Sequence, residues 1–439
     1  MKQIVIPAMV LALLFAYVPK SFADSDQEIQ ALKQQVQELM QRIEKLESEQ
    51  AQVKQEAVKA KEEVAKIKEG ATTLQAARVD LNNSLTKLKL KGRFAAGYYD
   101  AGKALSAPGS FEAPEGKIQF SFEPDTINTV VMRFNLNNAT ANSPLLDYFY
   151  LQSKDFIPYL KNTPFSLSGR IGRFKLGFGE ETFSDNPVEG ILPSNSAAKT
   201  GASDEGLELA GKIKLDKIKI FNYTLQPLGW VVSVSDGNSG VGSDLNSSKA
   251  FMGKFYYTPI KPLYLSASYY DSGKLGAQNA EMSIAGLVSR MASATTWRRR
   301  IWEADARYDF VKGKKPLDPP VYSDSKAIVR LSYGTFHDLT STVGAVERAG
   351  NFGFVDGIYN LNKKIYAAGR YSFVNLDGDT TATLNNVTAN EYTRYSLGLG
   401  YRWSENTILK LSYDWNKESG TNTEDSDDNL LSAIVATQF

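Results

Sequence analysis

The hydrophobic period of the chain changes once, near residue 85. Between residues 25 and 69, apolar or small residues recur every three and four positions, the heptad pattern of a coiled coil. From Leu85 to Phe439, apolar residues alternate with polar ones, which is the period of a β-strand with two unlike faces. The pattern therefore predicts a helical unit followed by an all-β unit.

The helical segment contains no Gly, Pro or aromatic residue. Its core positions are apolar or small in every heptad but one, where Gln50 stands at an a position. Opposite charges recur at facing g and e positions, as in Glu28 with Lys33 and Glu49 with Lys54, which is typical of parallel coiled coils. We expect residues 24–69 to self-associate, with the number of helices left open by Gln50. A single helix laced with charges is the alternative.

The first residues resemble an export signal. Lys2 precedes an apolar run from Ile4 to Tyr17, and Ser21-Phe22-Ala23 has the small-x-small pattern of a cleavage site. The run is shorter than the roughly 20 residues that a membrane-spanning helix needs. We therefore expect residues 1–23 to be a signal peptide and residues 70–84 to be a linker. The chain has no Cys, so a disulfide framework and a thiolate metal site are excluded.

The first predicted strand indicates what the two faces contact. One face is apolar from Leu88 to Tyr98, whereas the opposite face carries four successive cations, which are Lys87, Lys89, Lys91 and Arg93. Such a face suits a strand that has lipid on one side and water on the other. A solvated edge strand is the alternative for this segment alone. The same alternation recurs along the chain, so we expect residues 85–439 to form a β-barrel in an outer membrane.

The connections between strands differ in length. Short turns are expected near residues 124–126, 258–262, 360–363 and 404–406, and long polar loops near residues 100–115, 177–204, 236–248, 272–297, 337–350, 376–390 and 417–428. Outer-membrane barrels place short turns in the periplasm and long loops outside. The sequence thus predicts an all-β transmembrane barrel of about 16 antiparallel strands, with an N-terminal α-helical coiled coil in the periplasm. The terminal Phe439 ends the last alternating strand.

Residues opposite the apolar face should line a pore. Most of the charged ones are cations, so we expect an anion pathway lined by Lys87, Lys89, Lys91, Arg93, Arg133, Arg173, Lys175, Lys212, Lys214, Lys254, Arg330, Arg370, Arg394, Arg402 and Lys410. Arg173 and Lys175 precede the long loop to residue 204, which would narrow the pore if it folded inward. The strict alternation of the two strand faces is interrupted between Arg170 and Arg173, which predicts a bulge at Gly169 or Gly172.

Three segments carry a resemblance to a known family. Residues 172–181 (GRFKLGFGEE), residues 255–269 (FYYTPIKPLYLSASY) and residues 397–413 (LGLGYRWSENTILKLSY) resemble motifs of the phosphate-selective porin O/P family. The resemblance spans most of residues 85–439. It implies a homotrimeric porin with an inward-folded loop and passive diffusion of small anions such as phosphate. It does not match the family's phosphate-selecting residues one by one.

Other functions find less support in the residues. The only histidine is His337 and no nucleophile motif accompanies it, so we expect no catalytic residue, no metal site and no cofactor. The net charge of +1, which becomes −1 without residues 1–23, gives no reason to expect nucleic acid. The expected partners are other copies of the chain, outer-membrane lipid, lipopolysaccharide at Arg298-Arg299-Arg300 and small anions. The alternative function is a structural or conduit barrel, which anchors a periplasmic partner or electron carrier through the coiled coil; with no Cys-x-x-Cys-His, the chain itself binds no c-type haem.

Overall fold

The computed structural model describes residues 87–439 and scattered positions between 34 and 62. The gaps after residue 87 are 102–108, 138–144, 161–162, 182–185, 214–218, 221–222, 225–227, 238–246, 261, 277–278, 292–293, 311–320, 322–324, 379, 381, 386 and 421–427. The chain divides into two compact units, Met1–Asn83 and Ser84–Phe439. The predicted signal peptide and linker lie outside the described residues.

The described positions of the first unit are helical. Arg42 and Glu38, one turn apart, form an ion pair at 3.5 Å. Leu46 and Val53, both at predicted d positions, are each 63% exposed. Among the described residues, no helix is long and apolar enough to cross a membrane.

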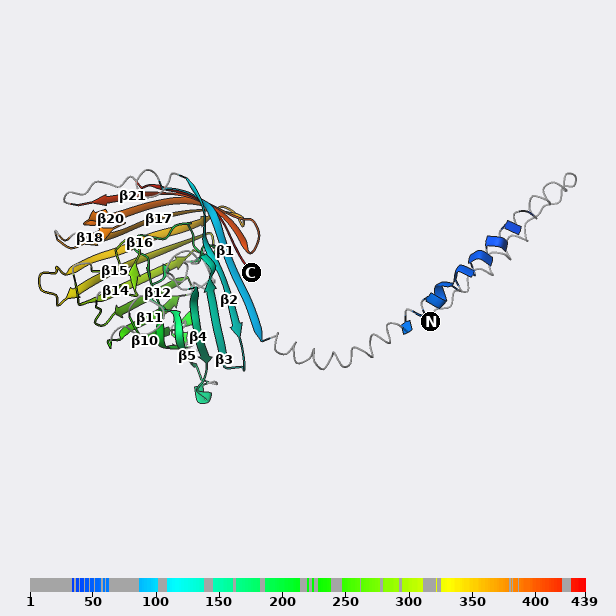
Figure 1. Cartoon of the computed structure of the whole chain (residues 1–439), viewed down its shortest axis with the longest axis horizontal. Helices are drawn as coiled ribbons and strands as arrows, with labels where there is room; N and C mark the ends of the chain where they lie inside the picture. Colours follow the sequence, from blue (N-terminus) through cyan, green and yellow to red (C-terminus); the bar gives the residue numbers. More distant parts are fainter. Residues whose placement is uncertain are drawn as a thin grey trace. The chain divides into compact units, whose positions relative to one another are not determined.

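The second unit is a closed antiparallel barrel of 16 strands (Figure 1). Its strands, in order around the ring, are β1 (Leu88–Asp100), β2 (Ser110–Phe122), β3 (Asn128–Asn135), β4 (Leu146–Lys154), β5 (Phe165–Lys175), β7 (Ser203–Ile213), β10 (Leu228–Ser235), β11 (Ala250–Ile260), β12 (Leu263–Asp271), β14 (Trp297–Asp309), β15 (Ala327–Thr340), β16 (Arg348–Asn360), β17 (Ile365–Leu376), β20 (Glu391–Arg402), β21 (Thr407–Ser419) and β22 (Leu430–Gln438). The predicted strand number and antiparallel order are confirmed.

The last strand closes the ring on the first. β22 pairs with β1 from Arg93 opposite Gln438 to Asp100 opposite Leu431. The backbone of Phe439 also exchanges two hydrogen bonds with Gly92, at 3.0 and 3.1 Å. Because closure leaves no unpaired strand edge, every strand of the barrel has a neighbour on both sides.

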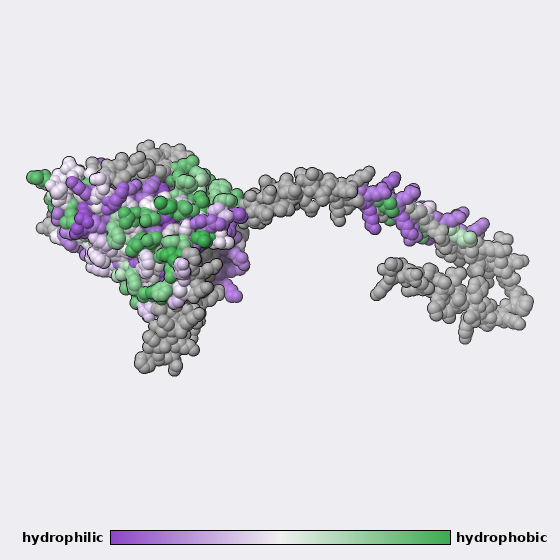
Figure 2. All heavy atoms as spheres, turned by 90° about the horizontal axis from the view of Figure 1, so that it is seen from below, coloured by the Kyte–Doolittle hydropathy of each residue, from purple (hydrophilic) through white to green (hydrophobic). Residues whose placement is uncertain are grey.

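The alternation in sequence becomes an alternation between the two faces of the wall. On β20, Leu397 and Leu399 are exposed outward, whereas Ser396 between two outward residues is buried. In the view of Figure 2, apolar side chains gather on the outer surface of the barrel and hydrophilic ones lie toward its ends. The face predicted to meet lipid is therefore the outer one.

The two ends of the barrel differ in their connections. At one end, called the turn end, are the predicted turns after β2, β11, β16 and β20. At the same end the chain also passes from β4 to β5, from β7 to β10 and from β14 to β15; the described residues of these connections include the short helix η2 (Pro158–Leu160) and the hairpin of β8 (Lys219–Ile220) with β9 (Tyr223–Thr224). The other end, called the loop end, carries the long loops.

The limits predicted for two loops, 100–115 and 337–350, are wrong. The flanking strands extend further than predicted, so that only residues 101–109 and 341–347 connect them. The reason is that polar residues at these strand ends have partners in the wall: Asp338 pairs with Arg299 at 2.8 Å and Arg93 pairs with Glu115. A register shift opposite Ala95 and Gly97 accommodates Pro114 within β2.

Three loop segments fold into the loop-end half of the barrel. β6 (Thr200–Gly201) pairs with β13 (Ser283–Ile284), which belongs to the loop after β12. Leu287 of the same loop bridges to Leu384, in the hairpin of β18 (Ala382–Leu384) and β19 (Val387–Ala389). Together with inward side chains such as Phe336 and Phe352, they form a buried apolar cluster. The loops are therefore packed against the wall between β5 and β20, a feature that the alternation did not predict.

Candidate solute pathway

The described residues 176–181 and 186–199, called the inner loop, lie inside the barrel. Lys254 on β11 donates to the carbonyl of Gly179 at 2.7 Å, Arg370 on β17 to that of Ser194 at 2.9 Å, and Lys410 on β21 to that of Pro187 at 2.6 Å. β11 stands far from β17 and β21 around the ring, so only a segment within the barrel can contact the inward faces of all three. The predicted inward folding of this loop is confirmed.

Further wall residues fix the same loop. Arg394 donates to the carbonyl of Asn195 at 3.0 Å, and the Tyr366 hydroxyl donates to that of Ile191 at 3.1 Å. Val188 and Ile191 pack against apolar side chains of the wall, including Ile408. Four of the predicted pore cations, Lys254, Arg370, Arg394 and Lys410, therefore hold the inner loop against the wall.

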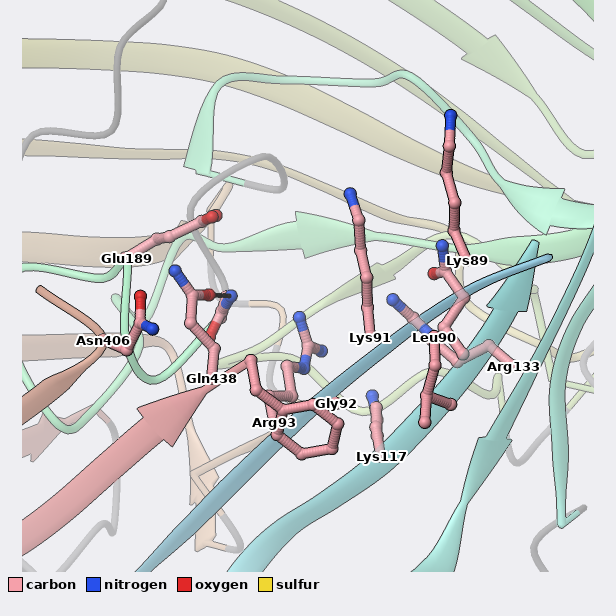
Figure 3. A pocket seen from close by; sticks show the side chains of 13 residues that line it. Lys89, Leu90, Lys91, Gly92, Arg93, Lys117, Arg133, Glu189, Asn406 and Gln438 are labelled. Atoms are coloured by element: carbon pink, nitrogen blue, oxygen red, sulfur yellow. Dashed lines mark hydrogen bonds between the residues drawn. The ribbon is translucent and has the colours of Figure 1, made fainter. Parts of the chain in front are cut away.

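The turn-end half of the interior contains a cavity of about 660 Å³ between the inner loop and strands β1 to β3 (Figure 3). Its charged lining residues are five cations and one acid, namely Lys89, Lys91, Arg93, Lys117, Arg133 and Glu189. Figure 3 shows the basic side chains of β1 on one side of this space and Glu189 of the inner loop on the other. We call this space the basic cavity.

Carboxylates of the wall balance part of this charge. Arg93 pairs with Glu115, and both Arg133 and Lys117 pair with Asp147, at 2.7 and 3.2 Å.

Lys89 pairs with Glu123 at 2.5 Å. The Lys91 ammonium, by contrast, makes no hydrogen bond or ion pair with any residue that the structure describes. Among side chains alone, with Glu115, Asp147 and Glu123 added to Glu189, five cations face four carboxylates, so the side-chain surplus is positive and small.

A second cavity of about 230 Å³ continues the path along the inner loop. Both cavities are lined by Asn186, and the second is also lined by Glu115, Glu181 and Arg370. This smaller space carries charges of both signs. A solute that moves past the inner loop would therefore pass from a mainly basic region into a smaller region that carries charges of both signs.

Arg173 and Lys175 line neither of the two cavities. Arg173 stands opposite Phe149 across the strands, but its own side chain is only 10% exposed. It forms an ion pair with Glu205 at 2.8 Å and lies 3.9 Å from Glu281, a residue of the loop after β12 whose side chain is 9% exposed. The inward arginine of β5 is Arg170, which pairs with Glu208.

The predicted bulge in β5 is wrong. The ladders of β5 with β4 and with β7 continue without a shift of register from residue 169 to residue 173. Instead, Gly172 has a φ of 118°, and a Cβ atom there would lie 2.3 Å from the carbonyl oxygen of Phe149. A glycine is required at this position because both the backbone conformation and the space exclude a side chain.

The remaining predicted pore residues lie at various places on the wall. Lys87 is exposed at the turn end and donates to the carbonyl of Pro124 at 3.2 Å, and Lys212 is half-buried on β7. Arg330 is buried and pairs with Asp356 at 2.6 Å, while Arg402 donates to the carbonyl of Val321 at 2.5 Å. Lys214 lies outside the described residues.

The basic triplet 298–300 is divided between the two faces. Arg299 is fully buried, pairs with Asp338, and donates to the carbonyl of Met282 at 3.3 Å. Arg298 and Arg300 are more exposed and both pair with Asp271.

Sequence reasoning missed Lys117 in the basic cavity. Ile118 and Phe120 point outward on β2, so the neighbouring Lys117 points inward. The alternation in the sequence was therefore sufficient to predict its direction. The acid that faces the cations, Glu189, comes from the inner loop and carries no periodic signal.

Neither a family model nor a curated protein matches this sequence. Solved structures match the barrel: the outer-membrane channel DcaP of Acinetobacter baumannii does so with a TM-score of 0.52 and 13% identity, over 80% of this chain and 97% of that one. The chain has the fold of outer-membrane porins. OmpT of Vibrio cholerae and OmpF of Salmonella typhi, the latter in complex with daunomycin, each match with a TM-score of 0.50 over 80% of this chain and 97% of theirs, at 10% and 12% identity. At such identities the likeness is one of fold.

Proposed function

We propose that the protein is an outer-membrane porin through which small solutes diffuse passively, with a preference for anions. The observation that carries this proposal is the basic cavity, which is lined by five cations and one acid and lies on the side of the interior that the inner loop leaves open. Fixed charges in a narrow aqueous space with low-dielectric walls attract counter-ions regardless of the charge of the whole chain.

The surplus of positive charge is small, so the preference is modest. Phosphate is one small anion that the cavity can admit, in keeping with the resemblance to the phosphate-selective porin O/P family. The three resembling segments occupy β5 with the start of the inner loop, β11 with β12, and β20 with β21. They belong to the wall and to the loop that narrows the interior.

The test is the reversal potential across a planar bilayer under a salt gradient. The Lys91→Gln variant should lose more anion preference than the Lys87→Gln variant. Lys87 directly precedes β1 and lies an even number of residues from Lys91, but only Lys91 lines the basic cavity, and its ammonium lacks a partner among the described residues. A cation-selective wild type would contradict the proposed anion preference. Equal effects of the two substitutions would remove the basic cavity from the pathway.

We also propose that residues 1–23 are a signal peptide and that the mature chain is a homotrimer with residues 24–69 as a periplasmic coiled coil. The exposed apolar side chains of Leu46 and Val53 at d positions support a helical partner, because a lone helix would leave this apolar stripe in water. Outer-membrane lipid, lipopolysaccharide and a periplasmic protein remain proposed partners.

We assign no catalytic role to the chain. His337 is half exposed and lies 3.5 Å from Glu347 at the loop end. Its replacement by Ala should leave solute diffusion unchanged.

A structural or conduit barrel is the second candidate function. The apolar cluster between the loops and the wall favours it, because such packing reduces the space for water. Single-channel conductance separates the two candidates. A protein that inserts into bilayers and produces no resolvable steps would support the structural role and contradict the porin.

A further inference from the structure

Four polar side chains on the inward face of β20, β21 and β22 are buried without partners. They are Ser396, Ser412, Asp414 and Ser432, each no more than 2% exposed. Among the described residues, no donor reaches either carboxylate oxygen of Asp414, and no group pairs with any of the three hydroxyl oxygens. Five buried oxygen atoms in one part of the wall thus have no hydrogen-bond partner.

The strand register brings these residues together. Ser396 is the direct cross-strand partner of Asp414, and Ser412 that of Ser432. Directly paired side chains have Cβ atoms about 5 Å apart, and residues two apart on one strand, such as Ser412 and Asp414, share a face. The four side chains therefore form one contiguous patch, which we call the serine–aspartate patch.

The inner loop covers this patch. A Cβ atom on Gly398, the cross-strand partner of Ser412, would lie 2.6 Å from a methyl carbon of Leu192 and 3.2 Å from the Cβ of Ser412. Leu192 itself is buried. The patch is consequently enclosed between the wall and the loop, away from the basic cavity.

The nearby cations are engaged elsewhere. Arg394, two residues from Ser396 on the same face, donates to Asn416 at 2.7 Å and to the carbonyl of Asn195. Lys410, two residues from Ser412, donates to carbonyls of the inner loop. An ionised carboxylate that is buried with neither a counter-charge nor a hydrogen bond costs several kcal/mol. A cation bound beside Asp414 would compensate this charge.

We propose that the serine–aspartate patch binds a hard metal cation, Na⁺ or Ca²⁺, which fastens the wall beneath the inner loop. The available donors are carboxylate and hydroxyl oxygens, the ligand type that such cations prefer over softer metals. Water alone could satisfy the hydroxyls, but it would not neutralise the carboxylate. This site is independent of the anion preference of the basic cavity.

The test is the thermal unfolding midpoint of the full chain in detergent. Protein stripped with EDTA is held in tetramethylammonium chloride, and NaCl or CaCl₂ is added at constant ionic strength. The midpoint of the wild type should rise with one of the two cations, which identifies the ion, and the rise should be absent in Asp414→Asn. Ser432→Ala, a milder change, should shift the response to a higher concentration of that cation.

Asp236→Asn is the control, because Asp204, Glu205 and Asp236 place carboxylate oxygens within 4.8 Å of one another at the loop end and could themselves respond to Ca²⁺. This variant should keep the wild-type response. A wild type indifferent to both cations overturns the proposal, as does an Asp414→Asn variant that responds like the wild type. If Asp414→Asn fails to fold, an unchanged response of Ser432→Ala overturns it instead.

Discussion

Arg370 connects the wall to the inner loop through both a carboxylate and a backbone carbonyl. Its guanidinium lies 3.2 Å from a carboxylate oxygen of Asp356 and 3.3 Å from one of Glu181, and it donates to the carbonyl of Ser194. Asp356 belongs to β16, whereas Glu181 and Ser194 belong to the inner loop. Replacement of Arg370 by Met keeps most of the side-chain volume and removes all three polar contacts.

The expected loss can be worked out from the partners that remain. Removal of one member of a buried ion pair costs 3–5 kcal/mol when the other charge is left alone. Here Asp356 keeps Arg330 at 2.6 Å, and Glu181 keeps the backbone N–H of Ser196 at 2.9 Å. Neither carboxylate is orphaned, so we expect the lower end of that range, about 3 kcal/mol, which shifts the equilibrium toward the released loop by about a hundredfold.

Single-channel conductance and the thermal unfolding midpoint provide the measurement. Arg370→Met should raise the conductance, because Arg370 lines the smaller cavity and a released loop widens it, and should lower the midpoint. Arg170→Met is the matched control. Arg170 also faces inward and pairs with a wall carboxylate, Glu208, but it lines neither cavity. An unchanged conductance in Arg370→Met, or an equal increase in Arg170→Met, would refute the anchoring role.

Four further outcomes are expected. Anion preference should weaken between 0.1 M and 1 M salt, because the Debye length shrinks from about 10 Å to about 3 Å; a preference that does not change with salt would speak against fixed charges. Deletion of residues 25–69 should lower the thermal stability of the oligomer. If assembly is unaltered by the deletion, the helix has another function. Burial, together with the neighbouring Asp204, raises the pKa of Glu281 to about 8 from a usual value of 4.5, so the folded chain keeps a proton that the unfolded chain loses. Stability should therefore fall as the pH rises from 4.5 to about 8, and Glu281→Gln should flatten that dependence in a pH series of unfolding midpoints. Arg173→Gln should reduce anion preference less than Lys91→Gln, since Arg173 lines neither cavity and is already paired with Glu205; the reverse order of reversal potentials would return Arg173 to the pathway.

The sequence alone determined the wall of the barrel. A period of two is a property of the extended backbone, so Leu397 and Leu399 had to share one face and Ser396 the other, whatever surrounded them. The same rule predicted 16 strands and the inward row Lys89, Lys91 and Arg93. The period of two continues through Gly172, where a positive φ replaces the predicted bulge, and the limits of strands were missed at ends such as Asp338, where buried polar pairs resemble a loop.

Only the tertiary structure decided what fills the barrel. The alternation predicted that Lys91 and Lys410 both point inward. Lys91 faces the basic cavity, whereas Lys410 donates to carbonyls of residues more than 200 positions earlier in the chain. The inner loop and the apolar cluster at the loop end follow no period, because their positions depend on contacts between segments remote in sequence. A local pattern fixes the side of the wall on which a residue lies, whereas the residues that meet it there are fixed by the folding of the whole chain.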